Sequence, residues 1–454
     1  MNLKKYHIFS WLTALVLSAA FLYSCSPVDL DFDSSPSQGR EDSMIRIPVK
    51  EYRNVFVVYS MGFNDLYSYL KEDVQDILSS PLMNNRRDII LILSHLANHY
   101  PGERYPRYSE EVSPTLTKIS LNSAGEIQKD TLMVLPKGTI AASSETLREV
   151  LSFTKENFDA QNYGILLSSH GSGWVPEGYL NDPDKFDSQS NDLIPMMNRQ
   201  RQKLPVYNMG KEEDEIAVKS MGVHCFTQYD TQEMDIQEIA AAFPFKMDYI
   251  IFDACYMGGV EVAYELRNVT DKMIFSQTEI LGDGMDYKTM ASYIFASEGP
   301  DLKGFCERYF DYYNSKSGQY RSATISMIDC SKLEPLAMAA KDIFQKYRVN
   351  LTQVENLRNV QKYYRSSYSY TQQWFYDFGD IVEKCSPSQE DLDTFNSRLE
   401  DAVIYKAATP NFMSSFKIEH HSGLSMYLPI ARRRDYLNNF YRALEWNKAT
   451  RLIP

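Results

Sequence analysis

One histidine and one cysteine stand at positions from which they could do acid–base and nucleophilic chemistry together. His170 follows the apolar run of "NYGILLSSHGSGW" (162–174), and Cys255 closes the apolar run "DYIIFDAC" (248–255). A thiol attacks a carbonyl carbon as its thiolate, and a nearby imidazole can take the thiol proton. The two residues would form such a pair if both runs were neighbouring strands of one sheet.

Glycines surround both residues. Gly171 and Gly173 follow His170, and Gly258 and Gly259 follow Cys255. Glycine allows backbone N–H groups to come close to a substrate, so donors for an oxyanion are expected here. A helix expected from "GGVEVAYEL" would also place its N-terminus near the thiolate. The alternative is structural, because a buried cysteine behaves as a small hydrophobic residue and a histidine after a strand can be an ordinary polar residue.

Short apolar runs alternate with amphipathic segments along the chain. This alternation predicts an α/β fold with a mainly parallel sheet covered by helices on both faces, followed by a helical C-terminal region. Neighbouring parallel strands lie roughly 5 Å apart, and their carboxyl ends form the binding crevice. The expected strands lie within 54–62, 86–100, 131–139, 163–174, 247–255, 272–280, 322–330 and 420–429, and the expected helices within 65–80, 143–158, 234–245, 258–268, 333–347 and 388–407.

The N-terminal residues read as a targeting segment rather than as part of the fold. Lys4 and Lys5 precede an apolar stretch that ends before "YSC". This pattern predicts a secretory signal and resembles a bacterial lipoprotein signal over residues 1–25, in which Cys25 would carry the lipid. A plain signal or anchor is the alternative. Residues 26–48 are acidic and contain Ser and Pro, as expected of a flexible tether, and they resemble the surface-export tag of Bacteroidetes lipoproteins.

The remaining chain is divided into a core at 49–335 and a C-terminal subdomain at 336–454 that completes the fold. A polar stretch at 177–222 without a sustained period is expected to be a surface insertion. The net charge of −13 argues against a nucleic-acid partner. Beyond Cys25 the cysteines are odd in number and include no CxxC pair, so no disulfide framework is expected. The 32 tyrosines indicate either a binding surface for carbohydrate or protein, or an aromatic-rich core.

The two strand-end motifs resemble a known family. "SSHGSGW" followed by "FDACYMGGVEVAYEL" is similar to the clostripain family of cysteine peptidases, in the caspase-like clan that includes gingipains and caspases. The resemblance extends from "VFVVYSMGFNDL" to "HHSGLSMYLP". It implies a caspase-like three-layer sandwich, with Cys255 as nucleophile and His170 as general acid/base. The reaction would be peptide-bond hydrolysis through a thioester acyl-enzyme, with no cofactor required for the chemistry.

The resemblance also implies a substrate pocket. Asp253 matches an acidic position that in relatives helps to receive a basic side chain, so cleavage after Arg or Lys is expected; a carboxylate can pair with arginine bidentately. The alternative is that Asp253 orients the turn or caps the next helix. Gly171 would contribute to substrate binding, and Glu279 or Asp283 could add a second carboxylate, although an exposed acid in a loop usually means solvation.

Further expectations concern activation, metal and partners. Family members are often zymogens cut between the two motifs, so autocleavage in "NRQRQKLP" (198–205) is one hypothesis and an uncut surface loop is the other. The resemblance makes Ca²⁺ a candidate cofactor, but no EF-hand spacing exists and no metal ligand is assigned. His420 and His421 would point to opposite faces of a strand, so joint ligation is not expected. A monomeric, exported lipoprotein at the outer membrane or cell surface, acting on proteins or peptides, is predicted.

Two other function classes remain open at this point. One is a non-catalytic surface lipoprotein that binds glycan or protein through its tyrosines, which would leave Cys255 without a role. Another is an inactive paralogue with the same fold, against which the intact His170 and Cys255 argue. A Ser–His hydrolase is disfavoured because no G-x-S-x-G elbow follows a strand.

Overall fold

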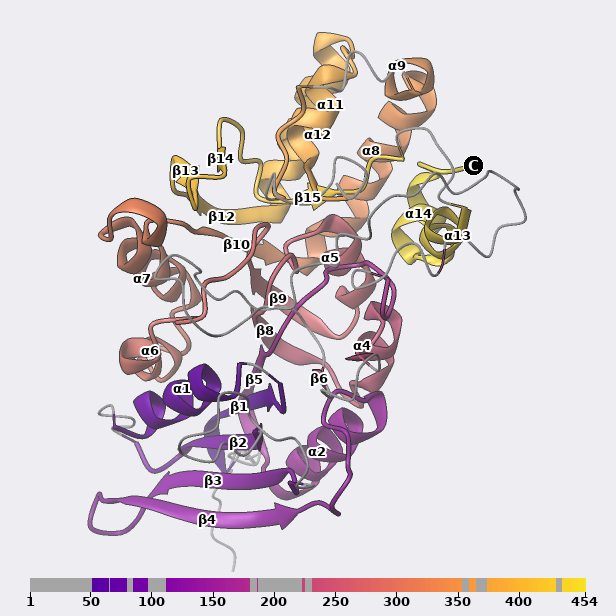
Figure 1. Cartoon of the computed structure of the whole chain (residues 1–454). Helices are drawn as coiled ribbons and strands as arrows, with labels where there is room; N and C mark the ends of the chain where they lie inside the picture. The colour runs from indigo at the N-terminus through magenta and orange to yellow at the C-terminus, as the bar shows by residue number, and fades with distance from the viewer. Residues whose placement is uncertain are drawn as a thin grey trace, which may run out of the picture. The chain divides into compact units, whose positions relative to one another are not determined.

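The central apolar runs of the chain form strands that are buried on both faces, as the sequence pattern predicts. In the computed structural model, nine strands form one sheet in the order β12-β10-β9-β8-β5-β1-β2-β3-β4 (Figure 1). The neighbours β9, β8, β5, β1 and β2 are parallel, and the edge pairs are antiparallel. The strands are β1 (Tyr52–Gly62), β2 (Asp88–Leu96), β3 (Thr115–Leu121), β4 (Ile127–Val134), β5 (Ala160–Ser168), β8 (Met247–Asp253), β9 (Thr270–Phe275), β10 (Thr324–Asp329) and β12 (Val403–Ala408).

The structure describes most of the chain after the targeting segment and its tether. Residues 49–454 form one compact unit. The predicted segments 1–25 and 26–48 lie outside the described residues, and so does almost all of the 177–222 insertion. The described residues are 51–64, 66–79, 85–96, 112–179, 186, 223–224, 231–352, 359–364, 374–429 and 435–454.

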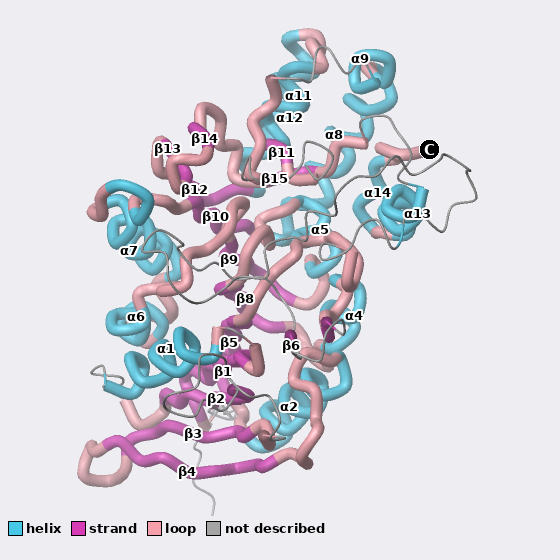
Figure 2. Tube along the Cα trace, in the orientation of Figure 1, coloured by secondary structure: helices cyan, strands magenta, loops and turns pink. Residues whose placement is uncertain are grey.

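Helices cover both faces of the sheet, which confirms the predicted α/β class and its layered arrangement (Figures 1 and 2). One layer contains α1 (Tyr67–Ser79), α6 (Tyr287–Ile294) and α7 (Leu302–Asn314), which pack against one another. The other layer contains α2 (Ser144–Asn157), α4 (Ile236–Ala242) and α5 (Val260–Leu266), joined by α8 (Leu333–Lys346), α12 (Gln389–Ala402) and α14 (Glu445–Thr450). The remaining helices are α9 (Arg348–Thr352), α11 (Phe378–Lys384), α13 (Asp435–Ala443) and the short 3₁₀ turns Gly318–Tyr320 and Cys330–Lys332.

Helix α2 illustrates why the sequence pattern succeeds. The Ser143 side chain accepts a hydrogen bond from the backbone N–H of Thr146 and so caps the first turn. Leu147, Val150 and Leu151 recur at helical spacing and are buried against the sheet. The helix ends at Asn157, where Phe158 adopts an extended conformation and leads directly into β5.

Two expectations about the sheet need correction. The stretch expected as one short strand near residue 132 is the second arm of an antiparallel hairpin, β3–β4, whose turn contains Gly125 at φ 81°. Residues 420–429 are not a full closing strand: only β15 (Ser425–Met426) forms, and it pairs with β11 (Tyr376–Asp377). Strand β12 closes the main sheet instead. Two more pairs of two-residue strands occur among the described residues: β6 (Val223–His224) with β7 (Thr231–Gln232), and β13 (Asn411–Phe412) with β14 (Phe416–Lys417).

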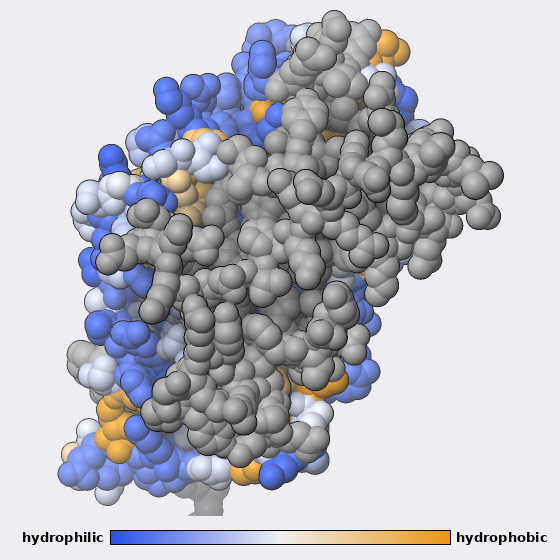
Figure 3. Space-filling model, in the orientation of Figure 1, coloured by the Kyte–Doolittle hydropathy of each residue, from blue (hydrophilic) through white to orange (hydrophobic). Residues whose placement is uncertain are grey.

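Most of the tyrosines among the described residues belong to the core. Tyr59, Tyr249, Tyr309, Tyr313, Tyr363 and Tyr441 are among the largest fully buried side chains of the described residues. The exposed large hydrophobic residues are scattered, and Tyr320 and Tyr436 are the tyrosines among them. Figure 3 shows the described surface on this face as largely hydrophilic with separate hydrophobic spots. No helix among the described residues has the length and apolar character needed to cross a membrane.

A buried carboxylate of α5 accepts hydrogen bonds from the C-terminal region. Glu261 on α5 accepts hydrogen bonds from the backbone N–H of Tyr427 (2.7 Å) and from the hydroxyl of Tyr441 on α13 (2.9 Å). Glu261 is completely buried, and this burial raises its pKa to about 7, although the two donors oppose the shift. The raised pKa means that the folded protein binds this proton more tightly than the unfolded chain does.

The free energy of unfolding should therefore depend on the protonation of Glu261. Its contribution is fully present below pH 4.5, the ordinary pKa, and is lost as the pH rises through about 7. A Glu261→Gln variant lacks this titration, so the difference in unfolding free energy between it and the wild type should change by about 3 kcal/mol between pH 4.5 and pH 8. Urea unfolding across this range measures it. The exposed Glu298→Gln is the control, and a pH-independent difference for Glu261→Gln would contradict the assignment.

Candidate active site

The pairing of β5 with β8 brings the two candidate catalytic residues to one edge of the sheet. These strands are parallel, and Ser168 lies opposite Asp253 in their register. His170 and Cys255 each lie two residues beyond this pair. The residue after His170 packs closely against the backbone of Cys255, because a Cβ atom placed on Gly171 would lie 2.4 Å from the carbonyl oxygen of Cys255 and 2.8 Å from its nitrogen. The side chains of both residues are enclosed, with His170 3% exposed and Cys255 1%.

The thiol of Cys255 meets the backbone of the loop that follows β9. The N–H of Ile280 donates to Sγ at 3.3 Å, and Sγ lies 3.8 Å from the carbonyl oxygen of the same residue. An N–H donor directed at sulfur favours the thiolate. The helix expected over 258–268 is present as α5, which begins at Val260 with Gly259 as its N-cap, five residues beyond Cys255. The donor to the sulfur comes from another strand end.

The other described cysteines lie in different surroundings. Cys306, Cys330 and Cys385 are free and buried, and burial raises the pKa of Cys330 and Cys385 to about 12. Burial also holds the pKa of Cys306 well above its usual value. A thiol with a raised pKa is a poor nucleophile near neutral pH. These three thiols are therefore poorly suited to act as nucleophiles.

The backbone directly after Cys255 is held in an unusual conformation. Tyr256 has φ 60°, in the left-handed region that a non-glycine residue adopts rarely. Its N–H donates to the carbonyl oxygen of Thr278 (3.0 Å), and its ring stacks on Phe375 at a centroid separation of 4.6 Å. Gly173 also has positive φ, and a Cβ there would lie 2.7 Å from the carbonyl oxygen of Tyr256. Contacts on several sides thus fix the peptide next to the thiol.

The C-terminal region completes the nucleophile loop. The N–H of Gly258 donates to the carbonyl oxygen of Ser276 (2.7 Å), and the carbonyl oxygen of Gly258 accepts from the N–H of Ser425 (2.9 Å). Gln277 donates through Nε2 to the carbonyl oxygen of Gly423 (2.8 Å). The loop therefore lies between the end of β9 and the segment that leads into β15.

Asp253 is the last residue of β8 and stands two residues before Cys255, and its exposed fraction is 0%. Its Oδ2 accepts hydrogen bonds from Ser168 Oγ (2.8 Å) and from the hydroxyl of Tyr287 (2.5 Å). The alternative in which Asp253 caps the following helix is wrong, since Gly259 occupies the N-cap of α5. Neither Ser168 nor Tyr287 was identified from the sequence, although Ser168 stands inside the motif "SSHGSGW".

The two further carboxylates differ in their positions. Glu279 is buried and directly precedes Ile280, whose backbone contacts the thiol, so it lies beside the candidate nucleophile. Asp283 lies on the following turn and is exposed. The structure thus brings Glu279 toward the site and leaves Asp283 at the surface, where solvation explains its presence.

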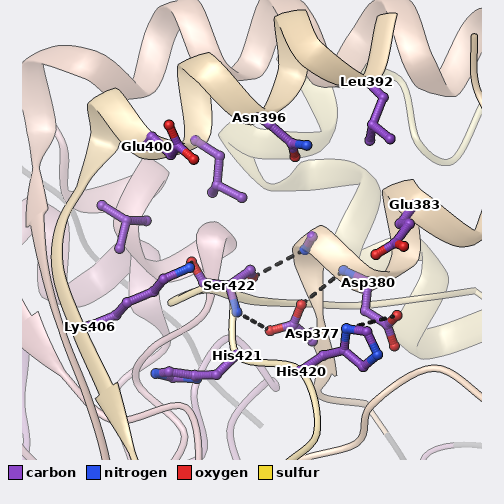
Figure 4. A pocket seen from close by; sticks show the side chains of 13 residues that line it. Asp377, Asp380, Glu383, Leu392, Asn396, Glu400, Lys406, His420, His421 and Ser422 are labelled. Atoms are coloured by element: carbon purple, nitrogen blue, oxygen red, sulfur yellow. Dashed lines mark hydrogen bonds and ion pairs between the residues drawn. The ribbon is translucent and has the colours of Figure 1, made fainter. Parts of the chain in front are cut away.

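A separate cavity of about 410 Å³ lies among α11, α12, β12 and residues 420–422 (Figure 4). Asp380, Glu383 and His420 line it with ligand atoms close enough to share a metal ion. Both oxygens of Asp380, however, accept from Lys384 Nζ at 2.7 Å, and one donor of the group is an imidazole. Ca²⁺ prefers six to eight oxygen ligands. This group does not fit the calcium that the family resemblance suggested.

The adjacent residues His420 and His421 contact different partners at this cavity. His420 Nδ1 lies 3.7 Å from Asp380 Oδ1, whereas His421 Nδ1 lies 3.1 Å from the hydroxyl of Tyr363. Figure 4 shows the two rings pointing in different directions. Asp377, which also lines the cavity, receives bonds from Tyr363, from the N–H of Ser422 and from the N–H of Asp380. Its carboxylate therefore holds the loop together.

Comparison with known proteins gives these motifs a context. A family model, the Clostripain family, matches residues 58–195 and 204–451, and both strand-end motifs lie within the match. Clostripain from Hathewaya histolytica is 22% identical over 487 residues, which cover 92% of this chain and 83% of clostripain.

Two solved structures share the fold. The structure of an inactive zymogen C11 protease from Parabacteroides distasonis is 26% identical, with a TM-score of 0.67, and the alignment covers 89% of this chain and 99% of that one. A secreted C11 cysteine protease from Bacteroides thetaiotaomicron, solved with an irreversible peptide inhibitor, is 20% identical, with a TM-score of 0.65 and coverage of 88% and 99%. Because the family match spans most of the chain and includes both strand-end motifs, this protein is a cysteine peptidase of the clostripain family.

Proposed function

We propose that this protein is an endopeptidase that cleaves after Arg or Lys, with Cys255 as nucleophile and His170 as general acid/base. The observation that carries the proposal is the parallel β5–β8 register, in which Ser168 lies opposite Asp253. His170 and Cys255 each follow two residues after this pair. The N–H of Ile280 adds support, because it donates to the sulfur that would carry negative charge. No third catalytic residue is assigned.

The proposed reaction has two steps. His170 takes the thiol proton, and Cys255 Sγ attacks the carbonyl carbon of the peptide bond to give a tetrahedral intermediate. This intermediate collapses to a thioester when the amine leaves with the proton from His170. Water, deprotonated by His170, then attacks the thioester carbon and releases the acid and the thiol. The close contact between Gly171 and the Cys255 backbone supports an oxyanion site formed by backbone N–H groups in this loop.

Asp253 is the proposed receptor for the basic side chain, and Glu279 is the second carboxylate of the pocket. Asp253 is supported by its place two residues before the nucleophile and by its fixed, enclosed carboxylate. Glu279 is supported by its burial beside Ile280. A peptide inhibitor binds the Bacteroides thetaiotaomicron relative, which agrees with a peptide as the partner of this chain. The alternative of a glycan-binding lipoprotein gains no support from the tyrosines of the described residues, most of which belong to the core.

Export and activation belong to the same proposal. Cys25 is the proposed lipidated N-terminus, which would anchor a monomeric enzyme at the outer membrane or cell surface. Autocleavage within residues 198–205 is the proposed activation step. The Parabacteroides distasonis relative is an inactive zymogen, which agrees with activation by processing in this family. Ca²⁺ is given no role in this reaction, because the one candidate cluster among the described residues does not fit it.

Substitution of the nucleophile tests the proposed reaction. Fluorogenic peptides that end in Arg or Lys should be cleaved by the wild type, and Cys255→Ala should lose at least 10³-fold in kcat/KM because no acyl-enzyme can form. Cys306→Ala removes an equally buried thiol and is the matched control, with activity expected within a few-fold of the wild type. Wild-type activity retained by Cys255→Ala would refute the assignment of the nucleophile.

Loss of the charge at Asp253 should affect binding of basic residues selectively. Asp253→Asn keeps the size of the side chain but removes a charge-assisted contact, so kcat/KM for both basic peptides should fall by about 10²-fold or more. The rate at which iodoacetamide alkylates Cys255 should change little. Asp248→Asn, at the other end of β8, controls for the loss of a carboxylate on this strand. Equal loss of peptide cleavage and of alkylation would indicate a structural role for Asp253.

Processing of the insertion provides an independent test. Wild-type protein, incubated after purification, should convert to two fragments with a new N-terminus inside residues 198–205, whereas Cys255→Ala should remain a single chain. Mass spectrometry of the fragments locates the cut. A Cys255→Ala protein that arrives as the same two fragments would show that another peptidase makes the cut.

A further inference from the structure

Two hydroxyl groups converge on one oxygen of Asp253. Ser168 Oγ and the hydroxyl of Tyr287 both donate to Oδ2, at 2.8 Å and 2.5 Å. A carboxylate oxygen has two lone-pair directions for hydrogen bonds. The two hydroxyls therefore satisfy Oδ2 before any substrate arrives, and they also fix the rotation of the carboxylate about its Cβ–Cγ bond.

The fold holds the Tyr287 hydroxyl in this position. Tyr287 is the first residue of α6, and the preceding Asp286 pairs with Arg308 of α7 through Nε (2.6 Å) and through a second guanidinium nitrogen (2.5 Å). The ring is buried in the layer of helices that covers this face of the sheet. Burial, followed by the charge of Asp253, raises the pKa of Tyr287 well above its ordinary value, so the phenol stays protonated and acts as a donor.

Ser168 donates to the same oxygen from the neighbouring strand. It is the last residue of β5 and lies directly opposite Asp253 in the parallel register, so its hydroxyl is positioned by the sheet itself. One donor thus comes from the sheet and the other from the helical layer. One of the two hydroxyls would have to move for Oδ2 to accept a new hydrogen bond.

We infer that Tyr287 and Ser168 are specificity-determining residues that make this pocket favour lysine over arginine before the cleaved bond. This inference rests on the proposed function, in which Asp253 receives the basic side chain. A guanidinium pairs best with a carboxylate through two parallel N–H···O bonds, one to each oxygen. The two hydroxyls that already donate to Oδ2 compete with the guanidinium for this oxygen. A lysine ammonium is a compact charge that does not require the two-oxygen fork, so the occupied Oδ2 weakens its pairing less than that of arginine.

The test compares two peptides that differ only in Lys or Arg before the fluorophore, with the full-length chain. The wild type should cleave the Lys peptide with the higher kcat/KM. In Tyr287→Phe, Oδ2 regains a lone-pair direction, and the Lys-to-Arg ratio of kcat/KM should fall by about tenfold. Ser168→Ala should shift the ratio in the same direction, and the double variant should shift it further. Tyr59→Phe removes an equally buried hydroxyl that donates to Ala141 and should leave the ratio unchanged.

The ratio separates a specificity role from a structural one, because loss of folding lowers both rates together. A ratio in Tyr287→Phe and Ser168→Ala within twofold of the wild type, or a wild type that prefers Arg, would overturn the inference while leaving the peptidase assignment intact. A wild type that cleaves neither peptide would overturn the proposed specificity for basic residues and this inference with it. If Tyr287→Phe fails to fold, Ser168→Ala decides the question alone.

Discussion

The parallel pairing of β5 with β8 is the constraint on which the rest of the site depends. Parallel strands present their carboxyl ends at the same edge, and the register that sets Ser168 opposite Asp253 also fixes the starting points of the His170 and Cys255 loops. The strands are buried on both faces, so a slip of one residue would turn apolar side chains toward the wrong layer. The same hydrophobic burial that stabilises the fold therefore sets the relative positions of the candidate base and nucleophile.

Around this pair, the structure maintains a backbone conformation that is unfavourable by itself. A non-glycine residue in the left-handed region costs roughly 1–2 kcal/mol, and Tyr256 adopts it directly after the thiol. The stacking of its ring on Phe375 and its bond to Thr278 offset that cost. Phe375 lies more than a hundred residues further along the chain, as does Ser425, which binds Gly258. The C-terminal region thus stabilises the nucleophile loop in addition to closing the sheet through β12.

Much of this arrangement was predictable from the sequence, and the limits have physical causes. Continuous apolar runs identify buried parallel strands, and residues at their ends must meet, which is why His170 and Cys255 could be paired. The start of α5 was predicted too early, because the N–H of Gly258 bonds to Ser276 and its carbonyl to Ser425, contacts that no local pattern reveals. Tyr287 escaped notice for a similar reason. Its role depends on how α6 packs over the sheet, and a tyrosine at a helix start has no distinctive signal.

Burial of Asp253 requires hydrogen-bond donors that hold its carboxylate in one orientation. An isolated buried carboxylate is costly, so it must be hydrogen-bonded or paired with a cation. Here Ser168 and Tyr287 supply two donors that are neutral, and two neutral hydroxyls leave the negative charge uncancelled. That charge also contributes to the raised pKa values of Tyr309 and Tyr313, for which burial is the larger cause. Burial and the two hydroxyl donors thus fix the position of this carboxylate two residues before the thiol.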